Sequence, residues 1–338
     1  MKNQFFQRKL KSIEVEKGKS ISQLLQEMAE TGFQGRRLGE VVEVWEEMLN
    51  DRDLTIFMGL AGSMSTTGQW KIIRWLVENR FIDVLVSTGA NISEDILEAM
   101  GFSYWQGSHL VDDRELYKHR IDRFYDIFAD EMEYRKMEAL IGEFTETLDP
   151  DYIYSSREYL YLFGKFLNEK GINSIVASAY RNNVPVFSPG LVDSGYGIAS
   201  IILRFKKGKK IVLDQMKDFE EIVKIGAESR ETGVIYIGGG VPKDFIQLIA
   251  VSLEFVKEED RPHKYAIQIT TDSPHWGGLS GATFEEAISW GKESHTGRNV
   301  ACYCDATIAL PLVAHALAER VERRSNAPIF SKFLKIPL

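Results

Sequence analysis

The chain has 338 residues, of which 44% are hydrophobic and 27% charged, so it has enough apolar side chains for a core and is not a largely disordered chain. Acidic residues outnumber basic ones by 49 to 41, which argues against a nucleic-acid-binding protein. The basic N-terminus lacks the apolar run of a signal peptide, and no stretch approaches the ~20 apolar residues of a membrane helix, so we expect a cytoplasmic protein without membrane contacts.

Apolar residues follow a helical spacing from Ser20 to Leu49, which predicts a helical N-terminal extension over residues 1–50. From residue 54 onward, short apolar runs alternate with amphipathic stretches, up to a last helix over 309–321. About seven strands are expected, most of them followed by a helix, and they include NSIVASA (173–179) and KKIVLD (209–214). This alternation is typical of a parallel sheet with helices on both faces.

Residues 101–150 interrupt the alternation. They are rich in charged and aromatic side chains, and residues 113–136 carry the longest helical pattern of the chain. We therefore predict a helical insertion at 101–150 within one α/β domain that spans residues 51–338.

Turns rich in glycine or hydroxyl groups follow five of the expected strands. They are GLAGSMSTTG (59–68), STGAN (87–91), SPGLVDSGYG (188–197), IGGG (237–240) and CDA (304–306). Glycine lets the backbone approach a phosphate, and the following helix offers free N–H groups at its start. Any one turn is equally what a tight strand-to-helix connection needs, and none matches G-x-G-x-x-G.

The C-terminal ends of parallel strands meet at one edge of a sheet, so the five turns together predict a dinucleotide site. The hydroxyls of Ser63, Thr66 and Thr88 are expected to donate to phosphate oxygens. The carboxylates of Asp193 and Asp305 are expected to accept from ribose hydroxyls.

A second cluster of reactive side chains runs over residues 271–292 (TDSPHWGGLSGATFEEAISWGK). Glu286 and Trp290 are four residues apart, so we expect them on one helix face, with Lys292 just past the helix end. A lysine desolvated beside a tryptophan keeps a neutral amine that attacks imines and carbonyls, and Trp290 offers its ring to a cationic substrate. The alternative is a surface lysine at a helix C-terminus, and composition alone favours it.

The stretches GGGVPKD, SPGLVD, STGAN and above all SGATFEEAISWGK resemble the deoxyhypusine synthases, over about residues 50–320. The resemblance implies a Rossmann-like, doubly wound fold and a homotetramer with active sites at subunit interfaces. It also implies an enzyme, a transferase of alkyl groups that uses NAD without net consumption. Spermidine is dehydrogenated, an active-site lysine captures the aminobutyl group as an imine, and the group passes to a lysine of an acceptor protein. No metal is expected.

The resemblance assigns roles to particular residues. Lys292 matches the imine-forming lysine, and Glu286 and Trp290 match its polyamine-contacting neighbours. Ser280 and Gly277 of the same segment complete the expected substrate-binding set. The NAD-contacting stretches match Gly62, Ser63, Thr66, Thr88, Gly89, Glu94, Asp193, Gly238, Gly239, Asp305 and Ala306.

Three positions depart from the eukaryotic pattern. Asp244 stands where those members have a histidine, and Ile198 and Leu279 stand where they have carboxylates that hold the polyamine. Burying an amine charge without a carboxylate is costly, so we expect the tail of the substrate to be held differently, or the amine to be a different one. The chain therefore resembles the divergent "deoxyhypusine synthase-like" branch of bacteria and archaea.

The missing histidine leaves the proton acceptor open. Our hypothesis is that His275 or Asp244 accepts the amine proton during hydride transfer. The alternative for His275 is a loop residue that hydrogen-bonds locally.

Three functions remain open at this point. The first is NAD-dependent aminobutyl transfer through a Lys292 imine, either to a protein lysine or to a small diamine such as putrescine, which gives homospermidine. The second is a non-catalytic NAD-binding homologue, and the third is an NAD-dependent amine dehydrogenase. Transfer leaves NAD unchanged overall, oxidation accumulates NADH, and a binding protein does neither.

Overall fold

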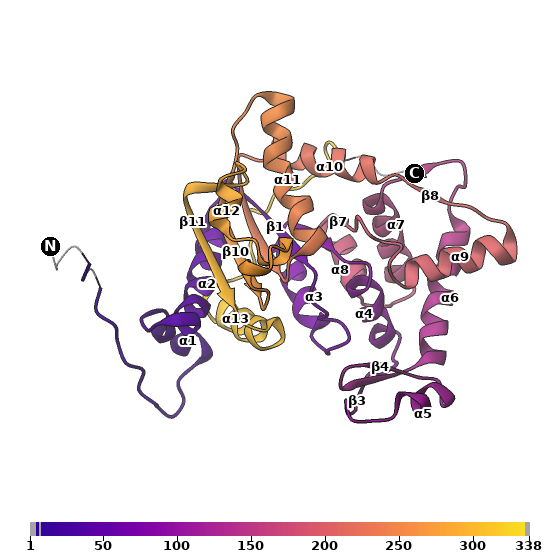
Figure 1. Cartoon of the computed structure of the whole chain (residues 1–338). Helices are drawn as coiled ribbons and strands as arrows, with labels where there is room; N and C mark the ends of the chain where they lie inside the picture. Colours follow the sequence, from indigo (N-terminus) through magenta and orange to yellow (C-terminus); the bar gives the residue numbers. More distant parts are fainter. Residues whose placement is uncertain (1–4, 7, 335–338) are drawn as a thin grey trace.

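The apolar runs that follow residue 54 form the parallel strands of one sheet in the computed structural model (Figure 1). Within residues 5–6 and 8–334, the part of the chain that the structure describes, this central sheet has six strands in the order β11-β10-β9-β1-β2-β7. Every neighbouring pair is parallel. The strands are β1 (Leu54–Leu60), β2 (Val84–Ser87), β7 (Val186–Phe187), β9 (Glu231–Ile237), β10 (His263–Thr270) and β11 (Glu293–Tyr303).

The strand order reverses direction between β1 and β9. β2 and β7 continue the sheet on one side of β1, whereas β9, β10 and β11 continue it on the other. In open α/β sheets, ligands bind at the carboxyl ends of the strands where the order reverses. The prediction of a mostly parallel sheet flanked by helices is confirmed, and its topology places the expected binding edge at the ends of β1 and β9.

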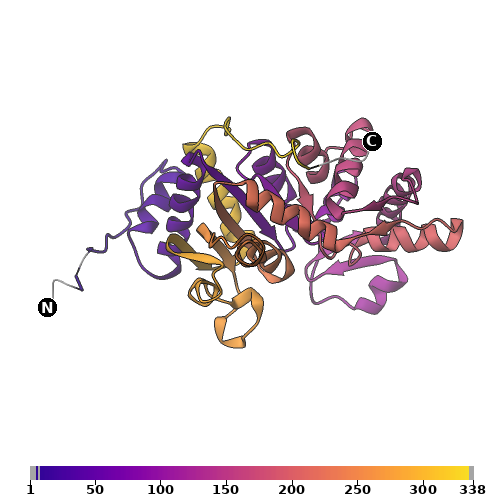
Figure 2. The same ribbon diagram turned by 90° about the horizontal axis from the view of Figure 1, so that it is seen from above.

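Helices cover both faces of the sheet (Figure 2). Successive strand residues point to opposite faces, so Ile56 and Met58 join one hydrophobic core while Phe57 joins the other. The first core contains side chains of α1 (Ile21–Ala29), α2 (Phe33–Asn50), α3 (Trp70–Glu78), α4 (Asn91–Ala99), α6 (Glu131–Thr147), α7 (Ser156–Glu169), α8 (Ile175–Asn182), α9 (Gly195–Lys207) and α13 (Ala306–Arg320). The second contains side chains of α10 (Gln215–Glu228), α11 (Gly240–Lys257) and α12 (Phe284–Ile288).

The segment over residues 8–20 lies outside the helical layers, beside α1 (Figure 1), and Arg8 and Lys11 pair with Glu30 at the end of that helix. α1 starts with a capping box, because Ser20 Oγ accepts from Gln23 N at 3.2 Å and Gln23 Oε1 accepts from Ser20 N at 2.9 Å. α2 lies against β10 and β11 and buries Trp45 and Met48. The helices predicted before residue 50 therefore form, and α2 shares its core with the sheet. Among the described residues, no helix has the length and apolar character needed to cross a membrane.

The insertion predicted as helical at 101–150 is only partly helical. It contains α5 (Asp113–Lys118), α6 and an antiparallel sheet of β3 (Trp105–Gln106), β5 (Ile127–Asp130) and β4 (Ile121–Phe124). Arg120 and Tyr125 have φ values of 56° and 54°, which end the helix before β4 and turn the chain between β4 and β5. Ile121, Phe124 and Phe128 recur at helical spacing, so the hairpin imitates a helix in the sequence.

The prediction of a strand at 173–179 is wrong, because α8 begins at Ile175 within this range. Ser174 Oγ accepts from Ala177 N at 3.1 Å and caps the helix, and Asn183 ends it with a φ of 53°. The predicted strand at 209–214 shrinks to β8 (Val212–Leu213), which pairs with β6 (Ile153–Tyr154) outside the central sheet. Periodicity does not separate a short buried helix from a buried strand, so the serine cap was the informative signal.

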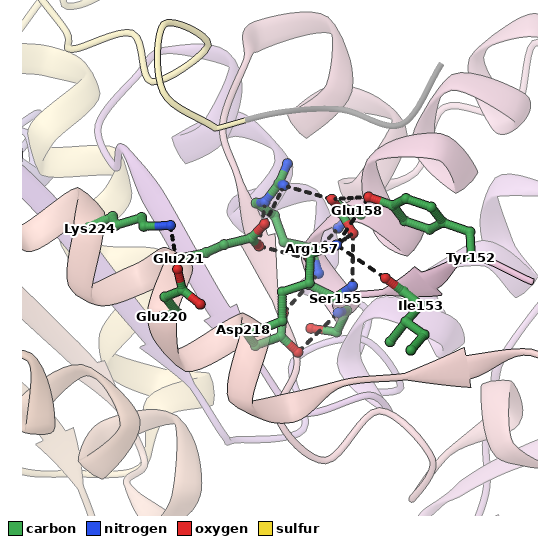
Figure 3. A network of polar contacts seen from close by, with 11 residues as sticks. Tyr152, Ile153, Ser155, Arg157, Glu158, Asp218, Glu220, Glu221 and Lys224 are labelled. Atoms are coloured by element: carbon green, nitrogen blue, oxygen red, sulfur yellow. Dashed lines mark hydrogen bonds and ion pairs between the residues drawn. The ribbon is translucent and has the colours of Figure 1, made fainter.

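A buried network of charged side chains joins α7 to α10 (Figure 3). Asp218 accepts from the backbone N–H groups of Ser156 and Arg157, at 3.0 Å and 3.1 Å, at the start of α7. Arg157 donates to both carboxylate oxygens of Glu221, at 2.8 Å through Nε and 2.7 Å through Nη2. Both partners are buried, so the pair fixes the two helices against each other.

We expect Glu221→Ala to lower the free energy of unfolding by about 3 kcal/mol, because it leaves the Arg157 guanidinium buried with part of its counter-charge removed. The matched control is Glu220→Ala on the same helix, whose pair with Lys224 is exposed and is worth less than about 0.5 kcal/mol. Denaturant unfolding of both variants checks this. Equal losses in the two variants would contradict it.

Candidate active site

The predicted turns meet at one edge of the sheet. Gly62 N donates to the Ile237 carbonyl at 3.3 Å, so the turn after β1 touches the turn after β9. Gly238 has a φ of +79°, and a Cβ added to it would lie 3.2 Å from Gly62 N. A Cβ on Gly89 would lie 2.6 Å from Ser194 Oγ, so the turn after β2 touches the loop that carries Asp193. The close approach of these backbones requires glycine at these points.

Hydroxyl groups line the same edge. Ser63 Oγ and Thr66 Oγ1 lie 2.6 Å apart in the turn after β1. Asn91 joins this turn to the next one, because its Nδ2 donates to the Gly62 carbonyl at 2.7 Å and to Thr88 Oγ1 at 3.0 Å. The sequence analysis missed Asn91 as a functional residue, although it closes the STGAN motif and begins α4.

Asp305 is the N-cap of α13, and its carboxylate accepts from the backbone N and the Oγ1 of Thr307, at 2.8 Å and 2.6 Å. Gln69 Nε2 donates to the Thr307 carbonyl at 2.8 Å, which ties this helix start to the segment after β1. Ala306 is the first residue of α13. The starts of α4, α11 and α13 thus follow strand ends at one edge, and with the hydroxyls they fit a dinucleotide with its phosphates at helix N-termini.

Two carboxyl groups lie near the start of α4, that of Glu94 half-buried and that of Asp95 fully buried. Burial, with the neighbouring charge of Asp95, raises the pKa of Glu94 to about 7. Burial also raises the pKa of Asp95 to about 7, although its carboxylate accepts from Ile175 N at 2.6 Å. A carboxyl with a raised pKa in the folded state stabilises the fold below its unfolded pKa of about 4, and this contribution is lost as the pH rises through about 7.

We expect Asp95→Asn to remove this pH dependence while it preserves the bond from Ile175 N. As the pH rises from about 4 to about 7, the free energy of unfolding of the variant is expected to increase relative to that of wild type by on the order of 3 kcal/mol. Urea titrations of both proteins at the two pH values measure this change. Asp151→Asn, on an exposed loop, is the control and leaves the pH dependence of wild type. A difference that is the same at both pH values contradicts the assignment.

Lys292 reaches Asp244. Lys292 Nζ donates to Asp244 Oδ1 at 2.8 Å and lies 5.6 Å from the centre of the Trp290 ring. Lys292 precedes β11 directly, and Asp244 lies in the second turn of α11. The Lys292 side chain is only 12% exposed, so its amine is held in a largely desolvated position beside one carboxylate and one aromatic face.

The segment with Ser280 contacts the glycine turn after β9, residues 237–240. Ser280 Oγ accepts from Gly240 N at 3.0 Å. A Cβ added to Gly239 would lie 2.5 Å from Ser280 Cα, so the two backbones are in direct contact. The expected cofactor edge and the expected substrate segment are therefore one continuous site.

Three other predicted residues of this segment are exposed: His275, Glu286 and Trp290. His275 is exposed, with Nδ1 2.7 Å from Ser273 Oγ and its ring against Trp276, so its contacts are local. Glu286 and Trp290 are both exposed, but α12 ends at Ile288, so the prediction that they share a helix face is wrong. Gly291, with a φ of +69°, turns the chain between that helix and Lys292.

The remaining predicted positions are on the surface. Gly277 has a φ of +71° and ends the short turn Pro274–Trp276. Asp193 is exposed. Ile198 and Leu279, which stand in place of carboxylates, are 42% and 37% exposed.

A family model described as deoxyhypusine synthase matches residues 23–317. The chain belongs to the deoxyhypusine synthase family. Membership of this family makes it a transferase enzyme. Proteins described as "Probable deoxyhypusine synthase 2" from Methanosarcina mazei and Archaeoglobus fulgidus are each 49% identical to it, over 93% and 90% of this chain and 92% and 99% of theirs.

The chain is also similar to a bacterial protein and to a solved structure. A "Deoxyhypusine synthase-like protein" from Chlorobaculum tepidum is 39% identical over 87% of this chain and 85% of its own length. A crystal structure from Entamoeba histolytica, of a protein assigned as a deoxyhypusine synthase, covers 94% of this chain and 100% of that one with a TM-score of 0.66. At 20% identity this likeness concerns the fold, which the two proteins share.

Proposed function

We propose that the chain is an NAD-dependent aminobutyl transferase that acts on spermidine or a related amine through an imine on Lys292. The observation that carries the proposal is the largely desolvated Lys292 amine, 2.8 Å from Asp244 and beside Trp290. Membership of the deoxyhypusine synthase family supports aminobutyl transfer. The Lys292 amine has the chemistry to hold an aminobutyl group covalently as an imine.

The glycine turns are the proposed NAD site, in a Rossmann-like arrangement. The reversal of strand order between β1 and β9 supports this, together with the hydroxyls of Ser63, Thr66 and Thr88. NAD, when bound, supplies the hydride acceptor that oxidation of an amine carbon requires. Asp193 and Asp305 are the proposed partners of ribose hydroxyls, and Glu94 and Ala306 line the same edge.

Asp244 is the proposed proton acceptor. Its carboxylate takes the Lys292 proton, which frees the amine lone pair for attack on the oxidised substrate carbon. A bond forms from Lys292 Nζ to that carbon, the carbon's bond to the leaving amine breaks, and the leaving amine carries away the proton. The contacts of His275 are with Ser273 and Trp276, whereas Asp244 is bonded to Lys292, and this difference supports Asp244 over His275 as the acceptor.

The acceptor of the aminobutyl group is either a protein lysine or a small diamine. The apolar residues Ile198 and Leu279 favour the small diamine, because they remove two carboxylates that a long polycation needs. The exposed rings of Trp276 and Trp290 support closure of the site by a second subunit, as in a homotetramer.

A trapping experiment tests the function. The protein is incubated with NAD and labelled spermidine, reduced with borohydride, and digested for mass spectrometry. An aminobutyl adduct on Lys292 supports the proposal. If NAD binds but spermidine, putrescine and homospermidine all give no adduct, the proposed transferase function is contradicted. Accumulation of NADH without an adduct identifies a dehydrogenase instead.

A further inference from the structure

Two pairs of acidic and basic residues lie at the candidate active site, where α11 meets the start of β11. α11 contributes Lys243 and Asp244, and the junction before β11 contributes Lys292 and Glu293. Asp244 and Lys292, which we call the outer pair, are bonded to each other at the surface of the site. Lys243 and Glu293, which we call the inner pair, are 0% and 1% exposed. The aminobutyl chemistry proposed above gives the inner pair no role.

The inner pair is not joined by a direct ion pair. Lys243 Nζ donates to Gln268 Oε1 at 3.0 Å and to the Ala282 carbonyl at 2.7 Å, and both acceptors are neutral. Glu293 Oε1 accepts from Gln247 Nε2 at 2.7 Å. Glu293 also interacts with the Tyr236 hydroxyl, which is neutral. Two buried charges without bonded counter-charges act on their neighbours through space.

Both members of the inner pair titrate near neutral pH. The pKa of Lys243 is lowered to about 8, mainly by burial; the Glu293 charge opposes this shift and the Lys292 charge adds to it. Burial raises the pKa of Glu293 to about 7, against the bond from Gln247 and the charges of Lys243 and Lys292.

The other charged groups around this space come from every packed element. Asp244 and Glu286 act on Lys243 from α11 and α12. Glu254 of α11 approaches Gly291, since its Oε2 would lie 3.8 Å from a Cβ added there. His263 of β10 is buried with its pKa lowered to about 4, so it is neutral at working pH.

We propose that Lys243 and Glu293 are positioning residues that set, through space, how readily Lys292 gives up its proton. The Lys243 ammonium favours the neutral amine of Lys292, and the Glu293 carboxylate opposes it. A neighbouring cation is one of the recognised ways to activate a lysine nucleophile. The use of this effect in catalysis rests on the proposed function, whereas the effect itself concerns only the reactivity of one amine.

Competitive acetylation tests the proposal without NAD or any amine substrate. The protein is treated with a trace of acetic anhydride at several pH values, and peptide mass spectrometry gives the ratio of acetylated Lys292 to acetylated Lys206, an exposed lysine of α9. We expect this ratio, at a fixed pH near 8, to fall about threefold or more in Lys243→Met and to rise about threefold or more in Glu293→Gln. The opposite signs identify an electrostatic effect.

Two further variants serve as controls. Lys243→Arg keeps the cation and is expected to keep the wild-type ratio, which separates charge from packing. Glu285→Gln removes an exposed charge from α12 and is expected to change nothing. If Lys243→Met does not fold, the rise in Glu293→Gln and the retained ratio in Lys243→Arg still decide the question.

The outcomes separate this inference from the proposed function. If Lys243→Met and Glu293→Gln both lower the ratio, or if neither changes it, the inner pair has only a structural role and the inference is overturned. If the ratios shift in opposite directions while the borohydride trap gives no adduct, the proposed function fails and the inference stands.

Discussion

Lys292→Arg is expected to abolish the trapped adduct and to reduce aminobutyl transfer by about a thousandfold or more, while NAD still binds. Arginine keeps the positive charge opposite Asp244 and so preserves the ion pair that holds the site. Its guanidinium remains protonated at any working pH and does not form an imine with an oxidised amine. The substitution therefore removes the capacity to form an imine and keeps the positive charge opposite Asp244.

The matched control is Lys264→Arg, at the start of β10. Lys264 is paired with Asp51 at 2.8 Å, so the same exchange there keeps an ion pair and is expected to keep full activity. Transfer rates and adduct formation are measured side by side with NAD affinity. Retained turnover in Lys292→Arg, or an adduct that moves to Lys243, would show that a different amine carries the group.

The strand-end turns were readable from the sequence because their chemistry is local. A glycine-rich turn after an apolar run predicts a strand followed by a helix, and parallel strands bring such turns to one edge. The contacts of Gly62 with Ile237 and of Gly89 with Ser194 follow from that rule. Asn91 was missed because its bonds to Gly62 and Thr88 cross between two turns, and sequence spacing carries no sign of them.

The two errors in the fold have a common cause. Apolar residues at spacings of three and four are compatible with a helix, yet the positive φ of Arg120 and Tyr125 converts that stretch into a hairpin. In the opposite case a short apolar run became α8 because Ser174 caps it. Local backbone geometry determines the secondary structure of both segments, and hydrophobic periodicity carries no information about that geometry.

The burial of the inner pair could not be predicted from the sequence either. Lys243 and Glu293 are 50 positions apart, and nothing in either segment predicts that both side chains turn away from solvent. The neighbouring residues Asp244 and Lys292 were predicted because the family resemblance assigns them to the site. Burial of the alternate side chains depends on the packing of α11 against β1, β2 and β9, which only the folded structure specifies.

Gly239→Ala is expected to weaken NAD binding at least about tenfold and to lower the free energy of unfolding by about 1–3 kcal/mol. The φ of Gly239 is −175°, which any residue adopts, so the effect comes from contact alone. Its added Cβ would lie 2.5 Å from Ser280 Cα and 2.8 Å from Ser280 Cβ, and a change of rotamer does not relieve a clash with backbone. The two segments must separate, which breaks the bond from Gly240 N to Ser280 Oγ.

Gly278→Ala is the matched control in the same segment. A Cβ at Gly278 meets no atom within 4 Å among the described residues, and its φ of −80° suits alanine. We expect this variant to keep wild-type stability within about 0.5 kcal/mol and to bind NAD as wild type does. Calorimetric titration with NAD and denaturant unfolding of both variants give the comparison. If Gly239→Ala binds NAD as tightly as Gly278→Ala, the contact between the glycine turn after β9 and Ser280 does not shape the cofactor site.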